Sequence, residues 1–575
     1  MTANPFKPTP EQARVIEHDG SAFVAASPGA GKTTVMVERA RRCLSVRGSG
    51  RGIAFLSFTT AAVSELEERL RREGLIATPA FPNFIGTFDS FLWQLLISPF
   101  AVEGCAERPR LIPDKDARDI QPYEGAQVLK LDCFDRRTGA AILEKLKRSG
   151  FRGNIKAHET AARTLRGRLL ARGELDFSDA REIALARLRD PANGLALRAA
   201  LAARFQELIV DEAQDCNPVD LEIIDWFRQA GTPVKVICDP NQAIYGFRGG
   251  VTRELVQFAR SFPAPERLPM SGNFRSSRHI ARGIVALRPA TERARVDEAL
   301  GAYRDEPSAV QILAYSGRGV PAAIGERFRE LTEDLGLAAK DCPVVAATRR
   351  TGANALGHPP DDGVRDLSYR LAVAVSDFHF SFELGGRKDA LETVHRIMLQ
   401  VAGRLGGKTY HQHLSEADLG PFDWRPGALA VADGLRFTTE WFATAQAWLD
   451  EARRLLEPLV PAGSGTIKQK LKWNSDLAKA LSSGPSNGHP ARTIHSVKGM
   501  EFPAVCVVMT AATAKGVLDS LVVVGANDDN EEARKIYVGA SRAERLLTIA
   551  VPRSQAERLR LLIAGMGAGV VVTEI

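Results

Sequence analysis

Short apolar runs, each bounded by small or polar residues, mark the predicted strands of this chain. Residues 22–26, 207–210 and 234–238 are runs of this kind, with the length and composition of buried strands. Between residues 90 and 210, and again between 350 and 490, much of the chain instead shows the spacing of amphipathic helices. The pattern therefore predicts strand-bearing segments interrupted by two largely helical stretches.

The loop after the first run, residues 26–34, has the composition of a phosphate-binding loop. Its sequence is AlaSerProGlyAlaGlyLysThrThr, and a helix-like segment follows it. Loop N–H groups and a helix N-terminus attract an anion, Lys32 adds a positive charge, and the hydroxyl of Thr33 can ligate Mg²⁺. Ala26 replaces the first glycine of the usual pattern, whereas Gly29 and Gly31 remain. The alternative is an ordinary glycine-rich turn before a helix.

The second apolar run leads directly into the adjacent carboxylates Asp211 and Glu212. Successive residues of a strand point in opposite directions, so the two acids can do different work. Asp211 can hold Mg²⁺ through its water shell, and Glu212 can take a proton from an attacking water. Taken alone, the pair could equally be an acidic loop after a strand.

The third run is followed by Gln242 and then by two aromatic residues beside an arginine, Tyr245, Phe247 and Arg248. A glutamine at a strand end can orient water or contact a terminal phosphate. Aromatic rings beside an arginine can stack on nucleic-acid bases. The alternative for the two rings is a place in the hydrophobic core.

Together with later segments, these residues form an ordered set. In chain order it comprises ThrProGluGlnAlaArgVal at 9–15, the phosphate loop, SerPheThrThrAlaAla at 57–62, GlyThrPheAsp at 86–89, AspGluAlaGln at 211–214, GlnAlaIleTyrGlyPheArg at 242–248, AsnPheArgSerSer at 273–277, HisSerValLysGlyMetGluPhe at 495–502 and TyrValGlyAlaSerArgAla at 537–543. The set resembles the motifs of superfamily 1 DNA helicases of the UvrD/Rep/PcrA group.

The resemblance implies an α/β fold with two RecA-like parallel-sheet P-loop cores, each carrying a mainly helical insert. The implied parts are 1–100 with 201–270 as the first core, 101–200 as its insert, 271–369 with 491–575 as the second core, and 370–490 as a reduced second insert. ATP with Mg²⁺ and single-stranded or tailed duplex DNA are the implied ligands.

The resemblance also implies a role for each matching residue. The catalytic residues would be Lys32, Glu212, Gln242, Arg275 and Arg542. The nucleotide would contact Gln12, Ala26, Ser27, Pro28, Gly29, Ala30, Gly31, Lys32, Thr33, Thr34, Phe274 and Glu501. DNA would contact Phe58, Thr59, Thr87, Tyr245, Phe247, Arg248 and His495, and the metal would be held by Thr33 and Asp211.

Four positions depart from the family pattern. Thr34 replaces an arginine that packs on the adenine, and Phe274 replaces the tyrosine on the other face of the base. Asp89 replaces a histidine and puts a carboxylate near the presumed DNA path, and Phe247 replaces a tryptophan. The changes at Thr34 and Phe274 predict loose selectivity for the base of the nucleotide.

Composition narrows the setting in which the protein acts. The 575 residues are 45% hydrophobic and 25% charged, with a net charge of +7, which suits a phosphate-backbone partner without deciding for one. The seven cysteines form no Cys-x-x-Cys pair, which argues against a disulfide framework or a zinc site. No run of 18 apolar residues and no signal-peptide pattern occurs, so we expect a cytoplasmic protein without a membrane span.

Two functions remain open at this point. One is an ATP-dependent motor that translocates on single-stranded DNA and unwinds duplex, with 3′ to 5′ movement as the direction that the family implies. The other is a nucleotide-hydrolysing, DNA-sensing subunit that acts with a separate nuclease. The short second insert, the absence of a nuclease pattern, Thr34 and Asp89 resemble the helicase subunits of Gabija-type anti-phage systems. A small-molecule kinase would leave the motifs after residue 490 unexplained.

Overall fold

A computed structural model gives the fold of the chain. It describes residues 6–45, 50–244, 252–357, 366–380, 384–405, 409–417, 419–438, 442–475, 477–482, 488–522 and 530–575. By their contacts the residues separate into two compact units. Unit 1 comprises Met1–Leu96, Arg181–Asp362 and Asn487–Ile575, and unit 2 comprises Ile97–Ala180 and Gly363–Ser486.

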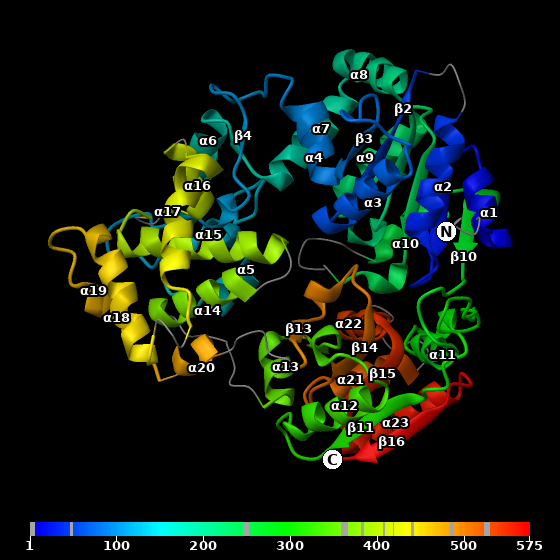
Figure 1. Ribbon diagram of the computed structural model, residues 1–575. Helices are drawn as coiled ribbons and strands as arrows, with labels where there is room; N and C mark the ends of the chain where they lie inside the picture. The colour runs from blue at the N-terminus through cyan, green and yellow to red at the C-terminus, as the bar shows by residue number, and fades with distance from the viewer. Residues whose placement is uncertain are drawn as a thin grey trace. The chain divides into compact units, whose positions relative to one another are not determined.

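The first of two parallel sheets in unit 1 has the strand order β10-β1-β9-β8-β2-β3 among the described residues. Its strands are β1 (Ala22–Ala26), β2 (Gly52–Ser57), β3 (Phe84–Thr87), β8 (Phe205–Val210), β9 (Val234–Cys238) and β10 (Arg267–Met270). The connecting helices, labelled in Figure 1, are α1 (Pro10–Glu17), α2 (Lys32–Leu44), α3 (Thr60–Arg72), α4 (Phe88–Leu92), α8 (Pro191–Arg204), α9 (Pro218–Gln229) and α10 (Thr252–Arg260). The strand ends that follow β1, β8 and β9 lie side by side, which brings three predicted site segments together.

The second parallel sheet has the order β13-β12-β14-β15-β11-β16 within the described ranges. Its strands are β11 (Val310–Tyr315), β12 (Val344–Ala346), β13 (Ala491–Thr493), β14 (Phe502–Val508), β15 (Ala543–Pro552) and β16 (Val570–Glu574). Its helices are α11 (Arg278–Ala286), α12 (Ala323–Asp334), α13 (Arg349–Ala355), α21 (Ala514–Val522), α22 (Glu531–Ala540) and α23 (Arg553–Ala564).

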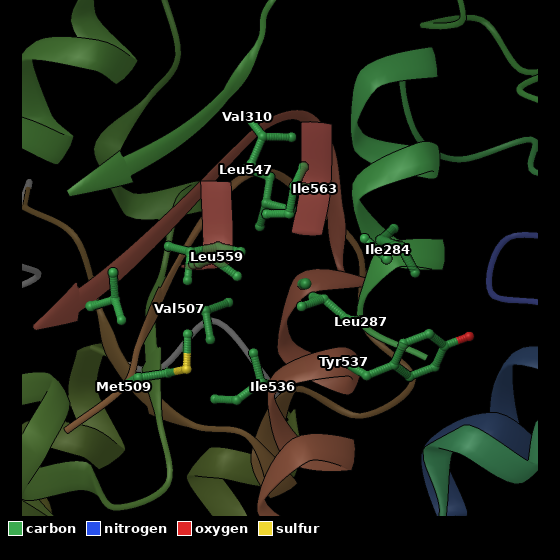
Figure 2. Packing of buried hydrophobic residues seen from close by; sticks show 14 of the residues in the cluster. Ile284, Leu287, Val310, Val507, Met509, Ile536, Tyr537, Leu547, Leu559 and Ile563 are labelled. Atoms are coloured by element: carbon green, nitrogen blue, oxygen red, sulfur yellow. The ribbon is translucent and has the colours of Figure 1, made fainter. Parts of the chain in front are cut away.

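This second sheet is buried on both faces. Val505 and Val507 of β14 pack in one apolar cluster with α11, α21, α22 and α23, whereas the alternate residues Ala504 and Cys506 pack in another with α12. Successive side chains of a strand point to opposite faces, so one strand supplies both clusters. Figure 2 shows the first cluster, in which the ring of Tyr537 lies at the edge with its hydroxyl directed away from the aliphatic side chains. The predicted fold class of two parallel-sheet α/β cores is confirmed.

Unit 2 is mainly helical. Its helices are α5 (Leu143–Arg148), α6 (Ile155–Ala171), the start of α7 (Phe177–Arg189), α14 (Leu367–Phe380), α15 (Leu384–Val401), α16 (Tyr410–Glu416), α17 (Pro421–Gly434), α18 (Ala445–Leu456), α19 (Ile467–Lys470) and α20 (Leu477–Ser482). The segment 98–142 differs from the expected helix, because it holds short strands and turns: β4 (Arg110–Leu111), β5 (Asp119–Ile120) and β6 (Leu129–Lys130), with β7 (Glu174–Leu175) pairing to β4. Pro109, Pro113 and Pro122 lie in this segment, and proline interrupts helices.

All seven cysteines are free thiols, six of them buried. Burial raises the pKa of Cys43 and of Cys342 to about 11, so both thiols stay protonated near neutral pH. Within the described ranges, no helix combines the length and the apolar character that crossing a membrane requires.

Candidate functional site

The phosphate loop joins β1 to α2 through two glycines in a left-handed conformation. Gly29 and Gly31 have backbone φ values of 73° and 78°, which residues with a Cβ rarely adopt. A Cβ at Gly29 would also lie 2.7 Å from Asn273 Oδ1, and one at Gly31 would lie 2.9 Å from Gln12 Nε2. Gln12 Nε2 donates a hydrogen bond to Ala30 O at 3.0 Å. The loop therefore has a fixed shape at the N-terminus of α2, as anion binding requires.

The first residues of the loop lie at the end of β1. Ala26 is the last residue of β1, and Ala26, Ser27, Pro28 and Ala30 are all buried. The backbone N–H of Ser27 donates to Met270 O of the neighbouring strand at 2.9 Å. Ala26 thus occupies a regular strand position, which a glycine is not needed to fill.

Lys32 lies between the two carboxylates that follow β8. Its Nζ is 2.6 Å from Glu212 Oε1 and 4.0 Å from Asp211 Oδ1. Burial opposes the charge of Lys32, but Glu212 and then Asp211 act more strongly, so the pKa of Lys32 lies above its ordinary value. Burial likewise favours the neutral form of Glu212, but the positive charges of Lys32, Lys498 and Arg542 together outweigh it, so the pKa of Glu212 falls to about 2. Without nucleotide, both groups are charged and paired to each other.

The backbone of Glu212 is strained. With φ 56° and ψ 36° it is the one non-glycine residue at positive φ among the described residues. This left-handed conformation costs about 1–2 kcal/mol for a residue with a Cβ. Gln214 Nε2 donates to Glu212 Oε2, and Gln214 Oε1 accepts from Asp239 N at 3.2 Å. Gln214 lies in the recognised AspGluAlaGln motif, but no role was predicted for it from the sequence. In the structure it orients the carboxylate of Glu212.

The site also fits a divalent cation. Asp211 Oδ1 is buried and accepts no hydrogen bond within the described part of the structure. Thr33, in the first turn of α2, lines the same cavity as Asp211. An oxygen set of this kind suits Mg²⁺, which keeps several waters and takes few protein ligands. No cluster of three or more His, Cys, Asp or Glu side chains that could hold a metal occurs in the described ranges.

Arg275 and Asn273 come to the phosphate loop from the segment after β10. Phe274 N donates to Gly29 O at 2.8 Å, and Asn273 Oδ1 accepts from the backbone N–H groups of Arg275 and Ser276 at 3.0 and 2.8 Å. The guanidinium of Arg275 contacts Glu501 Oε1, with Nε at 2.7 Å, and also donates to a backbone carbonyl. Asn273, part of the recognised motif but given no separate role, therefore fixes the turn that aims Arg275.

Arg542 contacts Gln242 directly. Arg542 Nη2 donates to Gln242 Oε1 at 2.5 Å, and its Nε donates to Val538 O at 3.1 Å. The remaining partner is the hydroxyl of Ser541. Burial, followed by the nearby Arg275, lowers the pKa of Arg542 to about 10. This buried cation thus makes its hydrogen bonds to neutral groups only.

A chain of buried polar side chains leads from Gln242 toward the phosphate loop. Gln242 Nε2 and Tyr537 Oη each donate to Asp239 Oδ2 at 3.0 Å. Arg288 Nε donates to Tyr537 Oη at 3.4 Å, and Arg288 Nη2 donates to Ser27 Oγ at 3.2 Å.

The chain closes on Asp297. Its carboxylate accepts from Arg288 and, at 2.8 Å, from Ser27 Oγ. Sequence reasoning missed Arg288 and Asp297, which lie outside every recognised motif, and no signal in one sequence would have paired them.

Lys498 forms a second buried link. Its Nζ lies 2.5 Å from Asp215 Oδ1, and both side chains are 3% exposed. Lys498 Nζ also donates to Gln242 O at 3.3 Å. Lys498 belongs to the recognised segment 495–502 and Asp215 directly follows the motif at 211–214, although neither had been given a role.

The predicted base contacts lie apart from these buried groups. Phe274 is 37% exposed, so its ring is available to a planar ligand. Thr34 Oγ1 accepts from Arg69 Nη1 at 3.0 Å, and Arg69 Nε donates to Glu73 at 3.2 Å. Glu501, predicted to contact the ribose, pairs with Arg275 here.

The predicted DNA contacts are held by local structure where they are described. Phe58 stacks on Phe88 with ring centroids 5.5 Å apart and an interplanar angle of 14°. Thr59 and Thr87 cap α3 and α4 through their hydroxyls, and His495 Nε2 lies 3.1 Å from Ile244 O. Tyr245, Phe247 and Arg248 lie outside the described residues. DNA contact therefore stays a prediction for all of them.

Asp89 is paired with a cation. Its Oδ1 lies 2.7 Å from Arg181 Nη2, and Arg181 Nε lies 2.7 Å from Asp220 Oδ1. Arg181 therefore offsets the charge that Asp89 was expected to present to phosphate. Sequence reasoning missed Arg181, which lies far from Asp89 in the chain.

Two segments of the chain match models of known protein families. Residues 8–263 match the UvrD/REP helicase N-terminal domain, and residues 486–554 match the UvrD-like helicase C-terminal domain. The ATP-dependent DNA helicase UvrD1 of Mycobacterium tuberculosis is 28% identical over 305 residues, which cover 48% of this chain and 39% of the relative. DNA helicase II of Haemophilus influenzae is 25% identical over 56% of this chain and 44% of its own length, and that of Escherichia coli is 25% identical over 46% and 38%. The chain thus spans about two-fifths of the length of these relatives.

Proposed function

We infer, because the chain belongs to the UvrD-like helicase family, that it is an ATP-dependent DNA helicase. The proposed activity is hydrolysis of ATP coupled to 3′ to 5′ translocation on single-stranded DNA and to unwinding of duplex, in the cytoplasm. The proposal includes the division into two cores and two inserts at the boundaries predicted from the sequence. The observations that carry it are the contact of Lys32 with Glu212 at the phosphate loop and the hydrogen bond by which Arg542, directly before β15 of the second sheet, reaches Gln242 of the first core.

The ion pair of Lys32 and Glu212 suggests how nucleotide would switch the site on. A bound phosphate competes with Glu212 for Lys32. When Lys32 turns to the phosphate, Glu212 loses the nearest of the cations that lower its pKa, so the pKa rises and the carboxylate becomes a better proton acceptor. Gln214 keeps the freed carboxylate oriented for an attacking water.

Thr33 and Asp211 are the residues that would hold Mg²⁺, whose charge offsets that of the phosphates when it is bound. Arg275 and Arg542 would stabilise charge on the transferred phosphoryl group, as arginine fingers do. Gln242 would contact the terminal phosphate. Because its side chain accepts a hydrogen bond from Arg542, this contact would couple phosphate binding to the second core. Phe58, Thr59, Thr87, Tyr245, Phe247, Arg248 and His495 are proposed to contact the DNA.

The activity is tested by ATP hydrolysis with and without single-stranded DNA. We expect DNA to stimulate turnover in the wild-type protein and Lys32→Ala to abolish turnover, because the substitution removes the charge that grips the phosphates. Lys515→Ala is the matched control, since that lysine is 73% exposed on α21 and pairs with Asp519 on the same helix. Wild-type turnover in Lys32→Ala would contradict the proposal. Duplexes with a 3′ or a 5′ tail then establish the direction of movement.

A second candidate is a subunit that hydrolyses nucleotide on DNA but unwinds little, and acts with a separate nuclease in anti-phage defence. This candidate is favoured by Thr34 and Asp89, two positions at which the chain resembles the helicase subunits of Gabija-type systems. DNA-stimulated hydrolysis without strand separation, together with a nuclease that co-purifies, would support this reading. Strand separation by the isolated chain would support the motor.

We expect loose selectivity for the base of the nucleotide. Phe274 offers one exposed ring, whereas Thr34 offers no planar partner. Losing one stacking partner is worth about 0.5–1.5 kcal/mol, so GTP and dATP should support hydrolysis within about tenfold of ATP. Steady-state kcat/KM for the three nucleotides measures this.

The control for this prediction is Arg69→Ala. Arg69 is engaged with Thr34 and Glu73, so its removal should leave the ratio of nucleotides unchanged. A thousandfold preference for ATP that Arg69→Ala abolished would show instead that Arg69 stacks on the base.

A further inference from the structure

Ser57 carries a buried hydroxyl that no described group satisfies. Ser57 is the last residue of β2 and is 6% exposed, and its Oγ makes no hydrogen bond within the described part of the structure. Buried polar atoms are almost always hydrogen-bonded to protein or to ordered water. An exception of this kind points to a water or an ion that completes the site.

A second unsatisfied oxygen belongs to the neighbouring strand end. β2 and β8 are adjacent parallel strands with Leu56 opposite Val210, and Asp211 N donates to Leu56 O at 2.8 Å. Ser57 and Asp211 therefore leave the same edge of the sheet from neighbouring strands. Asp211 Oδ1 is likewise buried without a hydrogen bond.

Both residues line one cavity of about 30 Å³. Thr33 lines it as well, and so does Glu65 of α3, so oxygen-bearing side chains enter it from β2, β8, α2 and α3. The rest of its wall is apolar and includes Met36 and Leu66. A polar cavity of this size has room for ordered water, and water needs partners of this kind.

We propose that Ser57 is a positioning residue for the divalent cation that accompanies the nucleotide. Its hydroxyl and Asp211 Oδ1 would together hold one water of the cation's hydration shell, and Thr33 would supply the direct ligand. Mg²⁺ gives up its waters reluctantly, so protein groups that receive those waters contribute to its affinity. The inference rests on the proposed nucleotide binding and adds to it the residue that orders the metal's outer shell.

Thr548 provides a matched control. It lies in β15, is fully buried, and its Oγ1 also lacks a hydrogen bond within the described ranges. Thr548→Val and Ser57→Ala therefore each remove an unsatisfied hydroxyl from a central strand of a parallel sheet. Only Ser57 lies beside Asp211.

The test measures thermal melting with a non-hydrolysable ATP analogue while Mg²⁺ is titrated, with EDTA as the metal-free reference. We expect Ser57→Ala to raise the Mg²⁺ concentration at half-maximal stabilisation by about 10-fold, in line with outer-shell substitutions elsewhere. Without ligand its melting temperature should be equal to or above that of the wild type, because an unsatisfied buried hydroxyl has been removed. Ser57→Thr, which keeps the hydroxyl, should retain the wild-type Mg²⁺ requirement, and so should Thr548→Val.

Several outcomes would overturn the inference. An unchanged Mg²⁺ midpoint in Ser57→Ala would make the hydroxyl purely structural, and an equal shift in Thr548→Val would make the effect non-local. Ser57→Cys, nearly the same size with a weaker donor, should show the same shift if Ser57→Ala folds poorly. If the wild-type protein gains no stability from nucleotide at any Mg²⁺ concentration, nucleotide binding itself fails. Failure of nucleotide binding can therefore be distinguished from failure of the role proposed for Ser57.

Discussion

Glu212→Gln is expected to lower ATP turnover by about 10²- to 10⁴-fold while nucleotide still binds, because it removes a general base and keeps the shape of the side chain. The structure adds a second expectation. Lys32 Nζ lies 2.6 Å from Glu212 Oε1, so the carboxylate competes with phosphate for the lysine. The amide competes less, and we expect the variant to bind nucleotide at least as tightly as the wild type.

The stability of ligand-free Glu212→Gln should fall, although its affinity for nucleotide should not. With the carboxylate gone, Lys32 stays buried, and the nearest carboxylate left to it among the described residues is that of Asp211, at 4.0 Å. A buried charge that loses its partner destabilises a protein, so the ligand-free melting temperature should fall. Nucleotide restores an anion beside Lys32, and the nucleotide-induced rise in melting temperature should therefore exceed that of the wild type.

Single-turnover hydrolysis and equilibrium binding of a fluorescent ATP analogue check these expectations. Glu222→Gln is the control, since Glu222 is a surface carboxylate on α9 paired with Arg189. Normal turnover in Glu212→Gln would remove Glu212 from the chemistry. Loss of binding together with turnover would make it a structural residue.

Arg542→Ala should lower kcat by about 10³-fold or more and change KM little, if Arg542 acts as an arginine finger. In the ligand-free structure the guanidinium is 97% buried, and its bonds go to Gln242, Ser541 and a backbone carbonyl. A buried cation without a carboxylate bonded to it costs stability, and its lowered pKa reflects this.

The fold should therefore tolerate neutral replacement of Arg542 better than the reaction does. We expect Arg542→Gln to melt at or above the wild-type temperature while its kcat collapses. Arg293→Ala is the control, because Arg293 is a partly buried arginine of unit 1 that, like Arg542, donates to backbone carbonyl oxygen. An effect confined to KM would make Arg542 a binding residue, and early melting of Arg542→Gln would make it a structural one.

The strands around the site could be predicted from sequence because local composition determines them. The runs at 22–26 and 234–238 coincide with β1 and β9. β8 begins at Phe205, two residues before the predicted run, and Glu207 is a buried residue within it. A carboxylate is tolerated there because Arg39 Nη2 lies 2.6 Å from it, a partner that the local pattern does not reveal.

The contacts between distant segments could not be predicted. Ser27 meets Asp297, and Asp89 meets Arg181, across long stretches of sequence with no spacing rule to connect them. The unsatisfied hydroxyl of Ser57 is a property of the packed interior, so composition gives no sign of it. Motif order predicts which residues carry chemistry, whereas the groups that position them appear only once the sheets are assembled.

The order of the second sheet has a consequence for how the chain is made. β11 pairs only with β15 and β16 among the described strands, and β12 pairs only with β13 and β14. During synthesis both strands therefore leave the ribosome long before any partner exists. At about 5–20 residues per second, they wait on the order of ten seconds while the second helical segment is added. Throughout that interval their apolar side chains and backbone edges lack the partners that cover them in the finished sheet, which exposes the nascent chain to aggregation.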